Sequence, residues 1–419
     1  MRRILFVTRY YASDIDTKIG GVFQRMRMLL EAASKVSDAL DVLFFVDQWV
    51  IDEIGPERSQ QSLATHWGIE ADVHLAPRAE KTHGRWANHL LSKVSIRYQE
   101  AYFKLGTAAQ ANAVMGRVRS DTDLIVGHRL DGTTPVVAAH PRNVPVVMDL
   151  DDIEHINLLR QLRRLPRSLG NLMRYGELPA LFFHEIALTR ACTISFVCSE
   201  NDRRYLAARG GGRVEVIPNS IRYFDEAPPD NARGTLFFIG TYGYPPNVDA
   251  AEFLIHDIFP RVLAKRPNAR LLIAGEAIEK LPSYRNPPPS VECVGFLPDL
   301  HDGYRAAAVV CCPILAGGGT RIKIIEAAAH RKAVVSTVLG AEGLDFEDGL
   351  EIVLRDGAQK FADACVSLLD DPQRAAAIGE AAYRKAKLRY DRAVVVERIA
   401  ENFRRAAKAA DISTDSPSS

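Results

Sequence analysis

The sequence predicts an α/β protein with two doubly wound parallel sheets, one in each of two domains. Short apolar segments rich in β-branched residues alternate with helical patterns along nearly the whole chain, and this alternation is typical of parallel sheets. The chain has 419 residues, which is long for one hydrophobic core. A polar, proline-containing segment at 221–233 interrupts the alternation and is the expected linker. We therefore expect domains at 1–220 and 221–391.

The composition is that of an ordinary globular protein, with 47% apolar and 25% charged residues. A net charge of +1 gives no global attraction to nucleic acid, and no nucleic-acid-binding module is recognisable. The first apolar run, Ile4–Val7, is too short for a signal peptide, and no run is long enough to span a bilayer. Six scattered cysteines lack zinc-site spacing. We expect free thiols and a cytoplasmic protein.

In the first domain the apolar runs predict a series of buried strands, which are Ile4–Val7, Val42–Val46, Val73–Leu75, Leu124–Val126, Val144–Leu150, Thr193–Cys198 and Val214–Ile217. The first strand leads through a loop to Gly20 and Gly21 and then to a helical pattern. A strand, a glycine-containing loop and a helix can hold a phosphate, although a plain glycine-rich turn has the same pattern. Arg25 and Arg27 in this helix are expected to be surface charges.

Two polar groups follow strands of the first domain. His128 lies just after Leu124–Val126, at the carboxyl end where open α/β sheets bind ligands, although a single histidine is often only structural. Asp149, Asp151 and Asp152 end the next strand. Because close carboxylates repel one another when desolvated, we expect this cluster to face solvent, a cation or a ligand. Alternatively, Asp151 or Asp152 caps the following helix. No histidine or cysteine at ligand spacing supports a metal.

Two stretches, 78–104 and 160–174, interleave basic with apolar residues. Basic amphipathic helices of this kind bind anionic membrane surfaces, so peripheral contact with the inner membrane face is one interpretation. The other is that the apolar faces of these helices belong to the domain core.

The second domain repeats the alternation. Its expected elements are the strands Thr235–Ile239, Leu271–Ala274, Val291–Phe296, Val309–Ile314, Ala333–Val338 and Glu351–Leu354, and the helices Asn247–Lys265, Asp299–Ala307, Ala358–Leu369 and Gln373–Leu388. A last helix covers 392–410. The remaining residues, 411–419, are small and polar, which predicts a disordered tail.

A glycine triplet, Gly317, Gly318 and Gly319, separates the strand Val309–Ile314 from a helix for which Thr320 is the expected N-cap. The first-turn N–H groups of a helix lack intrahelical partners and its dipole is positive there, so this turn is a potential anion site. Arg321 and Lys323 lie in the first turn, where the dipole disfavours cations. A multiply charged anion such as a diphosphate would offset that cost. The alternative is a tight turn with two solvated basic residues.

The stretch 317–344 reads G-G-G-T-R-I-K-I-I-E-A-A-A and, after a strand, L-G-A-E-G-L. It resembles the donor-site motif of GT-B glycosyltransferases of the retaining family 4, or group 1, type. The resemblance implies two Rossmann-like domains facing across a cleft, with the helix 392–410 packing back on the first domain. It also implies hexosyl transfer, as in polysaccharide biosynthesis, from a nucleotide-diphosphate sugar to a glycan or lipid-linked acceptor, with retention of configuration and without a cofactor or metal.

The resemblance also implies roles for individual residues. The glycine triplet and Thr320 would hold the donor diphosphate together with Gly240, and Glu326 would contact the ribose. Gly20 and Gly21 would close over the diphosphate from the first domain.

The catalytic residues that the resemblance implies are His128, beside the donor sugar, and Arg321 and Lys323. The last two would replace an Arg and a Lys that relatives carry in the loop read here as G-T-Y-G-Y-P-P-N. Asp149, Asp151 and Asp152 would lie on the acceptor side.

Gly318 occupies a position where many relatives carry a second glutamate near the sugar, so other groups must recognise the donor sugar. Two alternative functions remain open, a sugar-nucleotide epimerase of the same architecture and a non-catalytic protein that binds nucleotide sugars. A nicotinamide dehydrogenase is disfavoured because no G-x-G-x-x-G follows an early strand.

Overall fold

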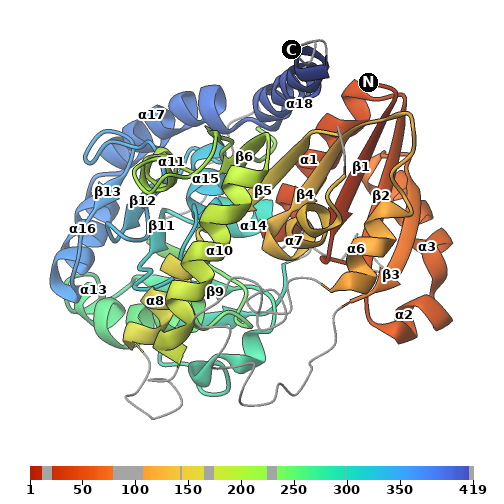
Figure 1. Ribbon diagram of the computed structural model, residues 1–419. Helices are drawn as coiled ribbons and strands as arrows, with labels where there is room; N and C mark the ends of the chain where they lie inside the picture. Colours follow the sequence, from red (N-terminus) through yellow and green to blue (C-terminus); the bar gives the residue numbers. More distant parts are fainter. Residues whose placement is uncertain are drawn as a thin grey trace. The chain divides into compact units, whose positions relative to one another are not determined.

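The computed structural model describes residues 1–11, 21–78, 107–141, 144–164, 174–223, 234–297 and 299–414. The chain, which Figure 1 colours by residue number, divides into two units. Unit 1 comprises Met1–Pro218 together with Val395–Ser419, and unit 2 comprises Asn219–Val394. Each unit is built on its own parallel sheet, as the α/β alternation predicts.

Unit 1 contains a seven-stranded parallel sheet with the strand order β3-β2-β1-β4-β5-β6-β7. The strands are β1 (Arg3–Thr8), β2 (Ala39–Val46), β3 (Asp72–Pro77), β4 (Thr122–His128), β5 (Val146–Asp151), β6 (Ile194–Val197) and β7 (Val214–Val216). The order reverses beside β1, so the loops after β1 and β4 diverge at the carboxyl edge, where sheets of this kind bind ligands.

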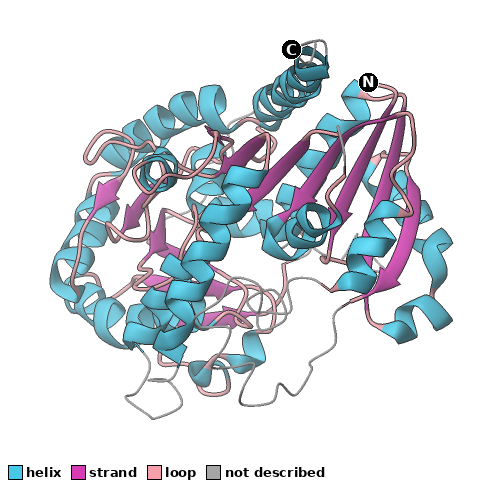
Figure 2. Cartoon of the chain, viewed as in Figure 1, coloured by secondary structure: helices cyan, strands magenta, loops and turns pink. Residues whose placement is uncertain are grey.

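Helices cover both faces of this sheet (Figure 2). They are α1 (Gly21–Val36), α2 (Gln48–Glu53), α3 (Gly55–Ser62), α6 (Ala108–Met115), α7 (Arg129–Ala139), α8 (Glu154–Arg164), α10 (Leu178–Ala191), α11 (Glu200–Ala207) and α18 (Arg392–Thr414). Alternation along β1 feeds two cores: Phe6 packs with α1 and α18, whereas Leu5 packs with α7 and α10. The ring of Phe403 in α18 stacks 6.0 Å from that of Phe196.

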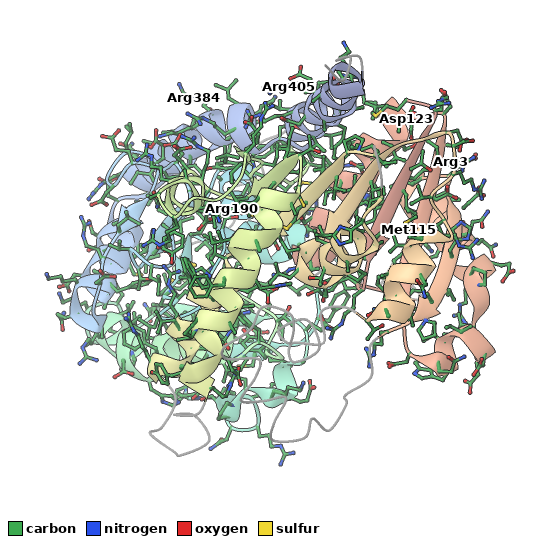
Figure 3. The ribbon with its side chains drawn as sticks, viewed as in Figure 1. Arg3, Met115, Asp123, Arg190, Arg384 and Arg405 are labelled. Atoms are coloured by element: carbon green, nitrogen blue, oxygen red, sulfur yellow. The ribbon has the colours of Figure 1, made fainter. Side chains whose placement is uncertain are left out.

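The amino edge of the same sheet carries ion pairs. The guanidinium of Arg2 lies 2.7 Å from Asp123, and that of Arg3 lies 2.8 Å from Asp41. Figure 3 shows Arg3 and Asp123 on this side of the sheet. The Arg2 pair is partly exposed and contributes little to stability, whereas the side chains of Arg3 and Asp41 are largely buried. The carboxyl edge is organised differently.

Unit 2 contains a six-stranded parallel sheet with the order β10-β9-β8-β11-β12-β13. The strands are β8 (Thr235–Ile239), β9 (Arg270–Ala274), β10 (Val291–Val294), β11 (Val309–Cys312), β12 (Ala333–Ser336) and β13 (Val353–Leu354). The helices are α12 (Pro245–Phe253), α13 (Phe259–Lys265), α14 (Leu300–Ala306), α15 (Ile322–Ala329), α16 (Ala358–Asp370) and α17 (Pro372–Tyr390). The loops after β8 and β11 lie side by side because these two strands are neighbours.

All six cysteines are free thiols, as predicted, and all but Cys293 are buried. Among the described helices, none combines the length and the apolar character needed to cross a membrane. The predicted basic stretch 78–104 lies outside the described residues apart from Arg78. Of the second stretch, Arg160 and Arg163 lie on α8, and Arg174 precedes a short 3₁₀ turn.

Candidate functional site

The glycine triplet lies between β11 and α15, as predicted. Gly317 (φ 103°) and Gly319 (φ 72°) have left-handed backbone conformations that side chains rarely adopt. A Cβ atom on Gly317 would lie 2.6 Å from the hydroxyl oxygen of Tyr244. Only glycine fits this position without a shift of its neighbours. Gly317 is itself buried, so the exposed part of the loop backbone lies at Gly318 and Gly319, which are half-buried.

The helix that follows begins one residue later than predicted. Its N-cap is Arg321 rather than Thr320, and no side chain caps it. The hydroxyl of Thr320 is used elsewhere, because it accepts a hydrogen bond from the Asn219 amide at 3.0 Å. The first turn of α15 therefore presents N–H groups that no capping side chain satisfies, at the positive end of the helix dipole.

Arg321 braces the glycine loop. Its Nη1 atom donates to the carbonyl oxygens of Gly318 and of Gly319, the latter at 2.5 Å. Its Nη2 atom is buried and forms no hydrogen bond with a described residue. An unsatisfied buried donor is costly, and this one lies close to Gly317. Arg321 thus both shapes the loop and keeps a donor for an external acceptor.

Lys323 is a cation without a carboxylate partner. Its Nζ atom donates to Asn247 Oδ1 at 3.0 Å and lies 4.2 Å from the centroid of the Phe238 ring. Although the side chain as a whole is only half-buried, burial of the ammonium lowers the pKa of Lys323 to about 8, and the charge of Arg321 contributes in the same direction. No described residue forms an ion pair with Lys323. A bound anion would reverse this shift.

The loop after β8 supplies the partner of Lys323. Gly240 ends that strand, and a Cβ atom there would lie 2.9 Å from the side chain of Asn247. Asn247 Nδ2 donates to the Thr241 carbonyl at 3.0 Å, which fixes the amide and turns its oxygen towards Lys323. No role for Asn247 is predicted from the sequence. The one sequence feature that could have indicated a role is its position after two prolines, in the loop that lacks the basic residues of relatives.

Glu326 lies one turn beyond Lys323 on α15, and its Oε2 atom accepts a hydrogen bond from Tyr304 at 2.7 Å. Tyr304 is fully buried and stacks on His330 at 4.5 Å between ring centroids. Burial, together with the charge of Glu326, raises the pKa of Tyr304 well above its ordinary value, so its hydroxyl remains a donor. The orientation of Glu326 is therefore set from inside the domain.

In unit 1, His128 ends β4 and is fully buried. Its Nδ1 atom lies 2.9 Å from Thr8 Oγ1, whereas its Nε2 atom forms no hydrogen bond with a described residue and lies 3.8 Å from Asp149 Oδ2. Burial, assisted by the charges of Arg129 and Arg25, lowers the pKa of His128 to about 3. The imidazole is therefore neutral at physiological pH.

Of the three surroundings expected for the aspartate cluster, Asp149 and Asp151 have a cation, the guanidinium of Arg25, rather than solvent or a ligand. The expectation that Arg25 is a surface charge is wrong. All three side chains are buried. Arg25 Nε lies 3.0 Å and 2.9 Å from the two carboxylate oxygens of Asp149, and 3.4 Å from Asp151. Burial alone would lower the pKa of Arg25, but these carboxylates raise it above its ordinary range. The guanidinium thus relieves the repulsion on which the prediction rested.

Glu185 from α10 binds the start of α8, the helix for which Asp151 or Asp152 was considered as a cap. The backbone N–H groups of Glu154 and His155 at the start of α8 donate to its two carboxylate oxygens, at 2.7 Å and 3.3 Å.

One set of potential metal ligands, Asp151, Asp152 and Cys198, lies within 4.8 Å. The adjoining positive charge of Arg25 disfavours a cation, as does the thiol of Cys198, whose pKa burial raises well above its ordinary value.

The donor-side residues lie together in unit 2. Gly240 lies in the loop after β8, the glycine triplet lies in the loop after β11, and Lys323 and Glu326 lie on the helix that follows. Of the glycine pair assigned to the first domain, Gly21 is the exposed first residue of α1. Gly20 lies outside the described residues.

The second unit matches a known family. Residues 233–371 fit the model described as "Glycosyl transferases group 1". A phosphatidyl-myo-inositol mannosyltransferase of Mycolicibacterium smegmatis is 31% identical over 218 residues, which are 48% of this chain and 54% of that protein. An uncharacterised 44.6 kDa protein of the Klebsiella pneumoniae cps region is 24% identical over 135 residues, or 30% of this chain and 35% of that protein. The chain thus spans about half, or less, of the length of these curated relatives.

Solved structures match over nearly the whole chain. HepE of Anabaena in complex with UDP and glucose matches with a TM-score of 0.62 and 17% identity over 97% of this chain and 100% of that one. Sucrose-phosphate synthase from Thermosynechococcus elongatus matches with a TM-score of 0.65 and 17% identity over 98% of this chain and 100% of that one. At this identity the similarity shows the fold, which is GT-B with two Rossmann-like domains, as predicted.

Proposed function

We propose that this chain is a GT-B glycosyltransferase that moves a hexosyl group from a nucleotide-diphosphate sugar to a glycan or lipid-linked acceptor, with retention of configuration. One observation carries the proposal: unit 2 holds an uncapped helix start, a partly exposed glycine loop and a lysine that no described carboxylate pairs, all at one place. This arrangement suits a pyrophosphate bridge. The group 1 match over 233–371 covers the same elements, which supports the assignment.

The chemistry that this site can perform is electrostatic. As the glycosidic bond of the donor breaks, negative charge develops on the departing phosphate. N–H donors at the start of α15, the Nη2 atom of Arg321 and the ammonium of Lys323 would stabilise that charge more strongly in the transition state than in the ground state. Glu326 would hold the ribose. The proposal requires no metal and no protein nucleophile.

Two relatives support the choice of donor and acceptor classes. HepE is solved with UDP and glucose, and the mycobacterial relative is a mannosyltransferase whose name includes a phosphoinositide acceptor. In the proposal unit 2 binds the donor and unit 1 the acceptor. His128 acts beside the donor sugar and Asp152 lies on the acceptor side. Peripheral membrane contact through the basic stretches would be tested by co-sedimentation with anionic and neutral vesicles, and equal pelleting would remove it.

The deciding experiment measures nucleotide binding and sugar transfer with the same variants. UDP, GDP and their sugars are first screened by thermal shift, where a ligand at 100 times its Kd adds about 2.7 kcal/mol of stability. With the ligand so identified, Arg321→Ala and Lys323→Ala should each lower turnover at least about tenfold, because one lost transition-state donor typically costs ~3 kcal/mol. Lys360→Ala, at an exposed lysine of unit 2, is the matched control.

Three outcomes would contradict parts of this assignment. Unchanged turnover in both variants would remove the pyrophosphate role of the glycine loop. Unchanged UDP or GDP affinity in Glu326→Ala would remove the ribose contact. Conversion of the donor sugar to its epimer without any acceptor would identify the protein as an epimerase instead.

A further inference from the structure

A second group of polar side chains, on unit 1, is satisfied neither by the fold nor by the donor site. Arg129 begins α7 at the end of β4, and Asp131 lies on its first turn. The Nε atom of Arg129 and the Oδ1 atom of Asp131 are both buried, and neither forms a hydrogen bond with a described residue. A buried polar atom left unpaired costs about 1–3 kcal/mol, so two such atoms on one helix turn indicate an external partner.

The remaining atoms of these two side chains are held in place. Arg129 has a left-handed backbone (φ 60°), its guanidinium carbon lies 5.5 Å from the centroid of the Tyr10 ring, and its Nη2 atom lies 3.8 Å from Asp151. The other oxygen of Asp131 lies 3.4 Å from Arg9. These contacts leave a donor, Nε, and an acceptor, Oδ1, that no described residue satisfies.

Glu154 adds a third group. It begins α8, but the carboxylate of Glu185 already caps that helix, so the carboxyl of Glu154 is not used there. Within the described part of the chain this carboxyl forms no hydrogen bond or ion pair. Burial raises the pKa of Glu154 to about 7; Arg129 opposes the shift, and Glu185, Asp131 and Asp152 add to it. Near neutral pH the group can therefore donate or accept a hydrogen bond.

The charges around this cluster select the kind of ligand. Two cations, Arg9 and Arg129, face four carboxyl groups, those of Asp131, Asp151, Asp152 and Glu154. Such a set repels a phosphate. A ring with several hydroxyl groups both donates and accepts hydrogen bonds without a charge.

We propose that Arg129, Asp131 and Glu154 form a subsite for an uncharged, hydroxyl-bearing ring, namely the sugar that accepts the transferred residue. The assignment rests on the proposed function for its identification of that ring as the acceptor. Arg129 Nε donates to one hydroxyl oxygen, Asp131 Oδ1 accepts from a neighbouring hydroxyl, and Glu154 bonds a third. These three residues take the acceptor-side role expected of Asp149, whose carboxylate is paired with Arg25.

Binding of free sugars to the full chain tests the subsite. Glucose, galactose, mannose and N-acetylglucosamine, with glucose 6-phosphate as the charged counterpart, are titrated by saturation-transfer NMR with and without UDP. At least one uncharged sugar should bind saturably and more tightly than the phosphate. Asp131→Ala and Glu154→Ala should weaken it at least tenfold, and Glu154→Gln should recover part of the loss. Glu70→Gln, at an exposed glutamate of unit 1, should change nothing.

Thermal unfolding separates binding from a structural role. The Glu154 carboxyl makes no hydrogen bond with a described residue, so Glu154→Ala should retain the melting temperature of the wild type. Asp131→Ala loses the partly exposed pair with Arg9 and should melt only slightly lower. The subsite is overturned if no uncharged sugar binds, if the variants bind as the wild type does, or if glucose 6-phosphate binds more tightly. UDP affinity, measured in parallel, tests the proposed function separately, since nucleotide binding without sugar binding refutes only the subsite.

Discussion

The carboxyl edges of the two sheets differ in how their charged side chains are paired. In unit 1, Arg25 lies between the carboxylates of Asp149 and Asp151, and all three side chains are buried and paired. In unit 2, Lys323 has an amide as its polar partner rather than a carboxylate. In the first, closed arrangement the charges are paired with one another. In the second, open arrangement no described carboxylate pairs with the ammonium. The same strand–loop–helix topology thus holds a paired charge cluster in one unit and, in the proposed function, an anion site in the other.

The largest effect should come from breaking the closed arrangement. Arg25→Met leaves Asp149 and Asp151 buried without their cation, which should lower the free energy of unfolding by about 3–5 kcal/mol. Arg27→Met is the matched control, because Arg27 makes a half-buried pair with Glu31 worth about 0.5 kcal/mol or less. Urea denaturation followed by circular dichroism measures both.

A double variant sharpens this test. Arg25→Met combined with Asp149→Leu removes both buried charges and should recover much of the loss. Equal losses for Arg25→Met and Arg27→Met would show that the buried arrangement is not the stabilising element that the comparison requires.

The open arrangement should make the affinity for UDP depend on pH. Burial lowers the pKa of Lys323 to about 8, so the free protein loses this ammonium charge above that pH. A bound diphosphate raises the pKa, and binding above about pH 8 must therefore take up a proton. UDP affinity should then fall by up to about tenfold per pH unit. The groups facing the ammonium are Cys312, Arg321 and Glu326, and burial raises the pKa of Cys312.

Calorimetry in two buffers of different ionisation enthalpy counts that proton directly. Lys323→Met should bind UDP more weakly and with a flat pH profile over the same range. A wild-type affinity that does not change between pH 7 and pH 9.5 would show that Lys323 does not contact the nucleotide.

Converting the open arrangement into a closed one should also reduce binding. Asn247→Asp places a carboxylate where the amide oxygen now lies, 3.0 Å from Lys323 Nζ. The new pair neutralises the ammonium, so UDP affinity should fall roughly tenfold, or ~1.4 kcal/mol. It should also move the pH dependence upward, because the carboxylate raises the pKa of Lys323. Asn268→Asp, at an exposed position of unit 2, controls for added charge. Equal affinities for the two variants would deny Asn247 this role.

Local sequence patterns were sufficient for the fold and for the glycine loop, because strand alternation and helix starts depend on neighbouring residues. They failed where the partner is distant in sequence. Arg25 has the helical position of a surface charge, and its burial depends on Asp149, 124 residues away. Thr320 has the residue type of an N-cap, but Asn219, 101 residues away, holds its hydroxyl. Such pairings need the folded sheet, since nothing near either residue indicates them.

The smallest expected effect concerns Glu326. Tyr304→Phe removes the hydroxyl that donates to Glu326 at 2.7 Å, which leaves the carboxylate less well oriented. UDP affinity should fall about fivefold, or ~1 kcal/mol, the usual net contribution of one hydrogen bond. Inorganic pyrophosphate should bind as before, because Glu326 in its proposed role contacts only the ribose. Tyr284→Phe, at an exposed tyrosine, is the control. Equal losses for both ligands would mean that Tyr304 supports the start of α15. The carboxyl edge of unit 2 would then depend on buried contacts, as the carboxyl edge of unit 1 does.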